Sequence, residues 1–225
     1  MKCCYMDVRA FSDPALYERI FREIPWQKRR DRILRCKFEK DRLLCLGADY
    51  LLMRFLREET HLEPEIFILE EGPHGKPFLT THPGLHFNLS HSGNYAALAG
   101  GTVPCGIDVE KTRVNYDKIA QRFFTETERK ALAFQDTDAA RNEAFLRIWT
   151  RKESYLKLSG VGLSRDLLSF NVLPDAPEDA VFYEHALPDH LLTVCISKED
   201  VMKGSAFKGF EECFLYKRAG TCYYC

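Results

Sequence analysis

The chain contains no long hydrophobic run. Nowhere in its 225 residues does an apolar stretch approach the roughly 18 residues that a membrane-spanning helix needs. The first residues, Met1-Lys2-Cys3-Cys4, are not followed by the apolar stretch of a secretory signal. We therefore expect a soluble, cytoplasmic protein that does not use a membrane as a partner.

An excess of charge of either sign is also absent. The sequence holds 32 lysine and arginine residues against 33 aspartate and glutamate residues, which gives a formal net charge of -1. Such a balance produces no overall attraction to nucleic acid. We expect no nucleic-acid partner, and any function that depends on charge must be local.

Patterns that would give cysteine or serine a catalytic role are missing as well. The nine cysteines are scattered, and Cys222 and Cys225 form a Cys-x-x-Cys pair without the second pair of a zinc ribbon. There is no Gly-x-Ser-x-Gly motif, and a strand would point the neighbours Ser90 and His91 to opposite faces. We expect reduced thiols, and a Ser-His hydrolase is disfavoured.

Helical and strand-like segments alternate along the chain, and the alternation occurs twice. Apolar residues recur at helical spacing over residues 14–57, and strand-like segments with Gly and Pro turns follow over residues 66–110. A second helical stretch covers residues 115–158, and residues 168–196 again read as strands. The pattern predicts an α+β protein.

Two similar α+β halves would account for this recurrence. The length suits one large domain or two packed halves, and no low-complexity linker divides the chain. We place the halves at residues 1–105 and 106–225 and expect a monomer.

Two acids stand two residues apart in the segment Gly106 to Glu110. On a strand, Asp108 and Glu110 would project from one face, so two carboxylates would point to one spot. Such a pair suits Mg²⁺, which takes one or two protein carboxylates and completes its shell with water and phosphate oxygens. An exposed strand edge with alternating acids is the other interpretation.

A third acid lies in the second helical stretch. Glu153 and Lys157 are spaced i, i+4 and share a helix face, as a surface ion pair would. Thr150 and Glu153 have the spacing of a capping box, but the apolar periodicity continues through Leu156 and puts Thr150 in mid-helix. Glu153 is therefore a candidate third metal ligand.

Groups that can bind phosphate occur in two further places. Lys76 lies in a Gly-Lys-Pro turn, and Ser90 and His91 lie at a strand end, where they offer hydroxyl, imidazole and amide donors. Residues 28–42 carry eight basic residues against three acids. A solvated helix face is the usual explanation of such a run, and a phosphate partner is the alternative.

Five motifs follow one another along the chain: Gly75-Lys76-Pro77, Phe87 to Ser92, Gly106 to Lys111, Phe123-Phe124 with Glu128, and Trp149 to Lys157 followed by Gly160 and Gly162. In this order they resemble the surfactin-synthetase type of 4′-phosphopantetheinyl transferase. The resemblance covers about residues 75–163. It implies two similar α+β halves with coenzyme A and Mg²⁺ bound in the cleft between them.

The resemblance also implies roles for single residues. Asp108, Glu110 and Glu153 would bind the metal, and Glu153 would also accept the proton of an incoming serine. Lys157 would hold the phosphate region. The coenzyme A phosphates would be contacted by Lys76, Ser90, His91, Lys152, Lys28, Arg32 and Arg42, with His91 near the 3′-phosphate. Glu128 matches an acid of the family, but with Thr125 it also has the spacing of a helix cap.

The implied reaction moves the 4′-phosphopantetheine arm of coenzyme A to a serine of an apo acyl or peptidyl carrier protein and releases 3′,5′-ADP. A magnesium-dependent hydrolase of nucleotide diphosphates and a non-catalytic relative that binds coenzyme A or a carrier are the alternatives. The intact set of three acids favours a catalyst. Residues 112–125, which include Val114, Tyr116 and Ile119, would help to form the carrier-docking surface unless they pack inward.

Overall fold

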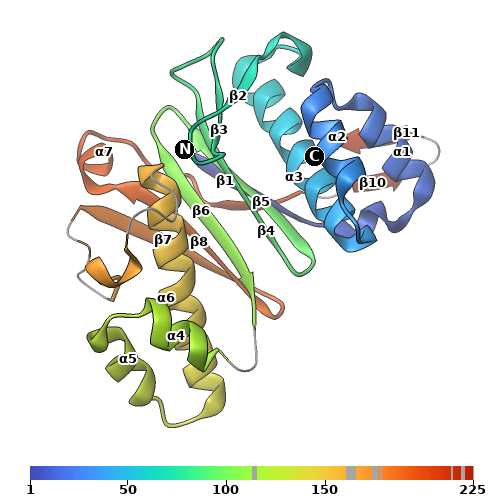
Figure 1. The fold of residues 1–225 in the computed structure, drawn as a ribbon. Helices are drawn as coiled ribbons and strands as arrows, with labels where there is room; N and C mark the ends of the chain where they lie inside the picture. Colours follow the sequence, from blue (N-terminus) through green and yellow to red (C-terminus); the bar gives the residue numbers. More distant parts are fainter. Residues whose placement is uncertain are drawn as a thin grey trace.

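In a computed structural model of the protein, the chain runs through a strand, a group of helices and a strand hairpin, and then repeats this order (Figure 1). The structure describes residues 1–112, 116–160, 166–173, 177, 179–213, 215–218 and 221–224, and of the last two ranges only the backbone.

The first half comprises β1 (Lys2–Asp7), η1 (Val8–Ser12), α1 (Pro14–Glu23), α2 (Gln27–Arg35), α3 (Glu39–Thr60), η2 (Pro64–Ile66), β2 (Leu69–Glu71), β3 (Pro77–Leu79), β4 (His86–Ser92) and β5 (Tyr95–Gly101). The second comprises β6 (Cys105–Lys111), α4 (Asp117–Phe123), α5 (Glu126–Ala133), α6 (Asp138–Ser159), η4 (Leu167–Ser169), β7 (Ala180–Leu187), β8 (His190–Ser197), α7 (Lys198–Met202), β9 (Phe210–Glu212), β10 (Leu215–Arg218) and β11 (Thr221–Tyr224).

The two halves share a topology. In the first, the helices end with the 22-residue α3, and the hairpin β4-β5 follows, whose second strand pairs antiparallel with β1. In the second, the helices end with the 22-residue α6, and the hairpin β7-β8 follows, whose second strand pairs antiparallel with β6. The predicted α+β fold with two similar halves is therefore confirmed.

The strand pairing also shows that the division of the chain into two halves is incomplete. The first sheet has the order β4-β5-β1-β9 and the second the order β6-β8-β7. Strand β9 comes from the end of the chain but pairs parallel with β1, so the C-terminal segment returns to the first sheet. The boundary at residue 105 remains a proposal.

Local sequence explains the ends of α6. Its N-cap is Thr137, whose hydroxyl accepts the Ala140 N–H at 3.1 Å. At the other end Gly160 adopts a left-handed conformation with φ of 68° and donates its N–H to the Leu156 carbonyl. The predicted stop at Gly160 is confirmed, whereas Gly162 lies outside the described residues. Among the helices that the structure describes, none combines the length and apolar character needed to cross a membrane.

An apolar core joins the two sheets. Tyr5 and Ala97 of the first sheet pack with Ile107, Val109 and Val194 of the second. Two further cores lie under the helices, one around α3 and one around α6. All seven cysteines whose side chains the structure describes are free thiols, as predicted; the side chains of Cys222 and Cys225 lie outside the description.

Candidate active site

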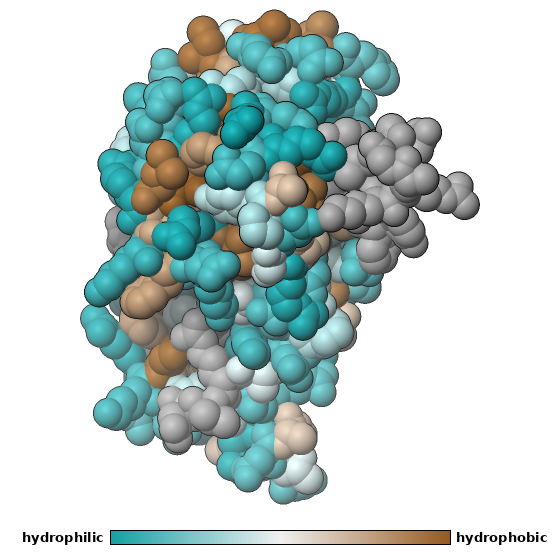
Figure 2. Space-filling model, turned by 90° about the vertical axis from the view of Figure 1, so that its right-hand side faces the viewer, coloured by the Kyte–Doolittle hydropathy of each residue, from teal (hydrophilic) through white to brown (hydrophobic). Residues whose placement is uncertain are grey.

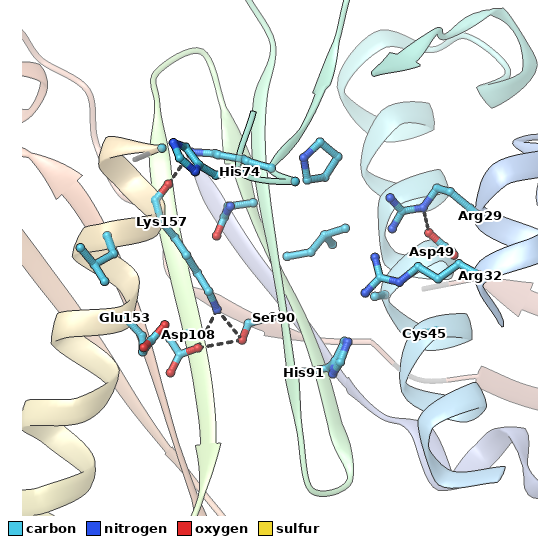
Figure 3. A pocket seen from close by; sticks show the side chains of 18 of the residues that line it. Arg29, Arg32, Cys45, Asp49, His74, Ser90, His91, Asp108, Glu153 and Lys157 are labelled. Atoms are coloured by element: carbon cyan, nitrogen blue, oxygen red, sulfur yellow. Dashed lines mark hydrogen bonds and ion pairs between the residues drawn. The ribbon is translucent and has the colours of Figure 1, made fainter. Parts of the chain in front are cut away.

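A cavity of about 610 Å³ lies between α6 with β6 on one side and α2 with α3 on the other, and β4 runs between these walls (Figure 3). Most of the residues singled out from the sequence line it: Arg32, Lys76, Ser90, His91, Asp108, Glu110, Glu153 and Lys157. Residues far apart in the sequence, from both halves, thus meet at one place.

Close packing of α6 on β6 brings the acids and Lys157 together. At Gly106 a Cβ atom would lie 1.8 Å from the Ser154 carbonyl oxygen, so only glycine permits this approach. The Lys157 Nζ then lies 2.7 Å from Asp108 Oδ1 and 3.1 Å from the Ser90 hydroxyl oxygen. The Ser90 hydroxyl in turn donates to the same Asp108 oxygen at 3.0 Å. Asp108 is therefore held by a cation and a hydroxyl from opposite halves of the chain.

The ionisation of the acids reflects their crowding. Burial, together with the charges of Asp108 and Glu110, raises the pKa of Glu153 to about 7, and Lys157 acts in the opposite direction. Burial also raises the pKa of Asp108. The other carboxylate oxygen of Asp108, Oδ2, is buried without a hydrogen-bond partner. A site of this kind favours a bound cation, because a cation relieves both the repulsion and the unsatisfied oxygen.

The donor set fits a hard divalent cation that brings its own additional ligands. In the part of the chain that the structure describes, no group of three or more His, Cys, Asp or Glu residues is arranged to hold a metal ion by itself. Mg²⁺ does not require such a cage, since it commonly uses one or two carboxylates with waters and substrate phosphates. Asp108, Glu110 and Glu153 are oxygen donors that suit it.

The opposite wall is cationic. Arg29 and Arg32 project from α2, and Arg29 forms an ion pair with the buried Asp49 of α3 (Figure 3). His91 faces the same space, and burial lowers its pKa, with the charges of Arg32 and Lys157 acting in the same direction. The cavity therefore has carboxylates on one wall and cations on the other.

Lys76 lines the cavity and connects the two halves. Its Nζ donates to the carbonyl oxygens of Lys157 at 2.5 Å and of Cys105 at 3.3 Å. Burial lowers the pKa of Lys76. A lysine bonded to a carbonyl of the last helical turn stabilises the end of α6. Its predicted contact with a phosphate stays a prediction.

Lys152 is not part of the cavity wall. Its side chain is fully buried, with Nζ 3.0 Å from Glu128 Oε2. It also donates to the carbonyl oxygens of Leu167 at 2.7 Å and Phe170 at 2.8 Å. An ammonium group has three donors, and these partners occupy all of them. We therefore correct the role predicted for Lys152: it ties the segment around η4 to α6 and leaves no donor for the coenzyme.

Two other predicted phosphate contacts also point elsewhere. Lys28 does not line the main cavity but an adjoining hollow, which shares Arg29 and Arg32 with it. Arg42 donates to the Cys36 carbonyl at 3.2 Å. Their contact with a phosphate stays a prediction that the side-chain positions do not support.

The cap interpretation of Glu128 is confirmed. The Thr125 hydroxyl accepts the Glu128 N–H at 3.2 Å, and Glu128 Oε2 accepts the Thr125 N–H at 2.8 Å. The second carboxylate oxygen accepts the Val172 N–H at 3.0 Å. This buried residue starts α5 and braces the chain beyond α6.

Two residues of the predicted docking segment, Tyr116 and Ile119, pack inward, and the role of the segment in docking stays a prediction. Tyr116 is buried and stacks on Phe145, with 4.4 Å between ring centroids, and Ile119 packs against the same core. Val114 lies outside the described residues. On the face shown in Figure 2, the described hydrophobic residues form small groups among hydrophilic ones, so no broad apolar docking surface stands out there either.

Sequence reasoning missed Arg29, Asp49, Asn88 and Ser92. Arg29 belongs to the basic run, but its pairing with Asp49 depends on the packing of α2 against α3. Asn88 and Ser92 share a strand face with Ser90, so the period of two could have identified them. Ser92 donates to Glu110 Oε2 at 2.9 Å and thus supports a proposed metal ligand.

Comparison with known proteins agrees with this geometry. The sequence model of the 4′-phosphopantetheinyl transferase superfamily matches residues 104–199, and that of the 4′-phosphopantetheinyl transferase N-terminal region matches residues 14–103. A 4′-phosphopantetheinyl transferase of Bacillus subtilis is 32% identical over 197 residues, which cover 82% of this chain and 88% of the relative.

Two further relatives show how widely the similarity extends. A 4′-phosphopantetheinyl transferase of Bacillus pumilus is 34% identical over 177 residues, which cover 73% of this chain and 75% of the relative. The L-aminoadipate-semialdehyde dehydrogenase-phosphopantetheinyl transferase of Xenopus laevis is 31% identical over 170 residues, which cover 69% of this chain and 56% of the relative. The chain belongs to the surfactin-synthetase type of the 4′-phosphopantetheinyl transferase family and is an enzyme of that type.

Proposed function

We propose that this enzyme transfers the 4′-phosphopantetheine arm of coenzyme A to a serine of an acyl or peptidyl carrier protein and releases 3′,5′-ADP, with Mg²⁺ as the required metal. The main support is the cavity with carboxylates on one wall and cations on the other. Coenzyme A carries a diphosphate and a separate 3′-phosphate, so its negative charge lies at two points that these walls could serve. A monomer in the cytoplasm is the proposed setting.

Asp108, Glu110 and Glu153 would hold the metal on the acidic wall. When bound, Mg²⁺ would neutralise negative charge on the diphosphate. On the cationic wall, Arg29, Arg32 and His91 would hold the 3′-phosphate, and an approaching phosphate would favour the protonated imidazole.

Glu153 and Lys157 are the residues to which we assign the chemistry. Glu153, a carboxylate on the acidic wall of the cavity, would accept the serine proton directly or through one water. Lys157 would stabilise the charge that develops on the transferred phosphate. These roles need no nucleophile from the enzyme, which agrees with the lack of a serine or cysteine triad in the sequence.

The bonds that change belong to the two substrates. The carrier serine oxygen forms a bond to the phosphorus that bears pantetheine, and the bond from this phosphorus to the bridging oxygen breaks. The serine proton passes to Glu153, and the bridging oxygen leaves with its electron pair as part of 3′,5′-ADP.

The test is a reaction with Mg²⁺, coenzyme A and a panel of apo carrier proteins, followed by intact mass measurement and by quantification of 3′,5′-ADP. We expect one phosphopantetheine per carrier and an equal amount of 3′,5′-ADP, and no product with a Ser→Ala carrier or after chelation of the metal. Release of 3′,5′-ADP at the same rate without any carrier would instead indicate the hydrolase. No product with any carrier would indicate a non-catalytic binder.

A further inference from the structure

Strands β4 and β6 belong to different sheets, yet their residues meet in a regular series. Three backbone N–H groups of β6 donate to side chains of β4. The pairs are Ile107 N–H to Asn88 Oδ1 at 3.0 Å, Val109 N–H to Ser90 Oγ at 3.2 Å and Lys111 N–H to Ser92 Oγ at 3.2 Å. We call Asn88, Ser90 and Ser92 the polar seam. It joins the halves of the protein through alternate side chains of one strand.

Two positions of the polar seam repeat one arrangement. Ser90 accepts an amide hydrogen and donates to Asp108 Oδ1 at 3.0 Å, and Ser92 accepts an amide hydrogen and donates to Glu110 Oε2 at 2.9 Å. In each case the amide belongs to the residue that follows the acid. A hydroxyl group has a single hydrogen, and the backbone amide fixes the oxygen that carries it, so this hydrogen is directed at the carboxylate.

The third position of the seam lacks an acid. Asn88 receives the Ile107 N–H, and the preceding residue of β6 is Gly106, against which the backbone of α6 packs. At Asn88, which also lines the cavity, the seam joins the strands without contacting a carboxylate, whereas Ser90 and Ser92 also hold carboxylates. This difference supplies a control within the molecule.

Glu110 lines the cavity, but Ser92 does not. A change at Ser92 therefore tests the support of Glu110 without altering the cavity wall itself. A glutamate side chain has several rotatable bonds, and Asp108 lies on the same strand face. Without the hydrogen bond from Ser92, repulsion between the two carboxylates would favour rotation of Glu110 away from Asp108.

We propose that Ser92 is a positioning residue, which holds the Glu110 carboxylate toward Asp108 and so prepares both for one divalent cation. The proposal rests on the proposed function, because the cation is the one that the reaction would use. Hydrogen-bond partners of metal ligands commonly change metal affinity when they are removed.

Direct metal binding by the full chain tests this role. Mn²⁺ would be titrated in the presence of coenzyme A, with the signal of free Mn²⁺ followed by electron paramagnetic resonance. We expect Ser92→Ala to weaken Mn²⁺ binding about tenfold and Ser92→Thr, which keeps the hydroxyl, to restore it. Asn88→Ala removes a seam bond without touching a carboxylate, so it should lower Tm but leave the Mn²⁺ affinity near that of the parent protein.

Kinetics provide a second readout that general loss of structure would not reproduce. With Ser92→Ala, the Mg²⁺ concentration for half-maximal activity should rise while kcat at saturating Mg²⁺ stays close to the parent value. A fall in kcat at every Mg²⁺ concentration, with unchanged Mg²⁺ dependence, would overturn the positioning role.

The binding outcomes separate the two proposals. Equal Mn²⁺ affinity of the parent and Ser92→Ala would overturn the role of Ser92 and leave the proposed function intact. Equal losses in Ser92→Ala and Asn88→Ala, in step with Tm, would show that the seam is structural only. If the parent bound no Mn²⁺ with coenzyme A present, the metal-dependent function and the positioning role would both be wrong.

Discussion

The folded protein disfavours the ionised form of Glu153. Burial and the neighbouring acids raise its pKa from an ordinary value of 4.5 to about 7. The folded chain therefore retains a proton that the unfolded chain has released between these two values. By linkage, the metal-free protein loses stability as the pH rises through this window.

Removal of this charge should stabilise the metal-free protein. We expect Glu153→Gln to increase the free energy of unfolding by about 2 kcal/mol at pH 8, and the gain should vanish below about pH 4, where the glutamate is largely protonated in both states. Thermal unfolding in the presence of a chelator, at several pH values, measures this. Glu143→Gln, an exposed change on the same helix, is the control. A gain of equal size at pH 5 and pH 8 would contradict the explanation.

At the residue scale, the sequence predicted the acidic wall better than the cationic one. The period of two in β6 and the i, i+4 spacing in α6 place Asp108, Glu110, Glu153 and Lys157 by local geometry alone. The orientation of α2 about its own axis against α3 decides instead which basic residues of 28–42 face the cavity. Pairing with the buried Asp49 decides this for Arg29, and no local pattern shows it.

At the scale of elements, the contact between β6 and α6 determines the site. The backbone of α6 touches β6 at Gly106, where the space for a Cβ atom is filled by the Ser154 carbonyl oxygen and the Leu158 nitrogen at 2.5 Å. Both are backbone atoms, so a side chain cannot be accommodated by a change of rotamer. Any larger residue must move the helix that carries Glu153 and Lys157.

Gly106→Ala should therefore impair both stability and activity. We expect a loss of about 2 to 3 kcal/mol, typical of overpacking, together with a large fall in kcat because Glu153 and Lys157 are displaced from Asp108. Chemical denaturation and carrier modification measure the two effects. Gly84→Ala is the matched control, since a Cβ at Gly84 would meet no atom within 4 Å. Normal activity of Gly106→Ala would show that α6 can shift without cost to the site.

Strands β1 and β9 escaped prediction. Strand β1 (Lys2–Asp7) packs one side against the core under α3 and the other against the core between the sheets, so its residues do not alternate in polarity. Strand β9 gives no local signal of the distant partner that it finds in β1. The long helices and the hairpin strands were predictable because each has one clear apolar pattern.

At the scale of the whole molecule, the halves resemble each other, and besides the core that each has under its long helix they share a third core between the sheets. Tyr5, Tyr95 and Ala97 of the first half are buried against Ile107 and Val194 of the second. If the two halves were separated, these side chains would be exposed to water, and the pairing of β9 with β1 would be lost as well. The similarity of the halves is thus a matter of topology, and stability is shared.

The chain should accordingly unfold in one cooperative transition. We expect the calorimetric and van't Hoff enthalpies to agree, as they do for a two-state protein. A fragment of residues 1–103, chosen at the end of the N-terminal family match, should show no cooperative unfolding of its own. Two resolved transitions of the full chain would contradict the shared core.

The ion pair between Lys157 and Asp108 has a consequence for the order in which ligands enter. The lysine neutralises the aspartate, so a cation that arrived alone would compete with an ammonium group 2.7 Å away. A coenzyme that arrives alone brings phosphates toward the carboxylates. If the proposed metal and the coenzyme bound together, Lys157 could turn from the aspartate to a phosphate and leave the carboxylate to the cation. Each ligand would then increase the affinity for the other, and by reciprocity the metal and the coenzyme should load as a pair.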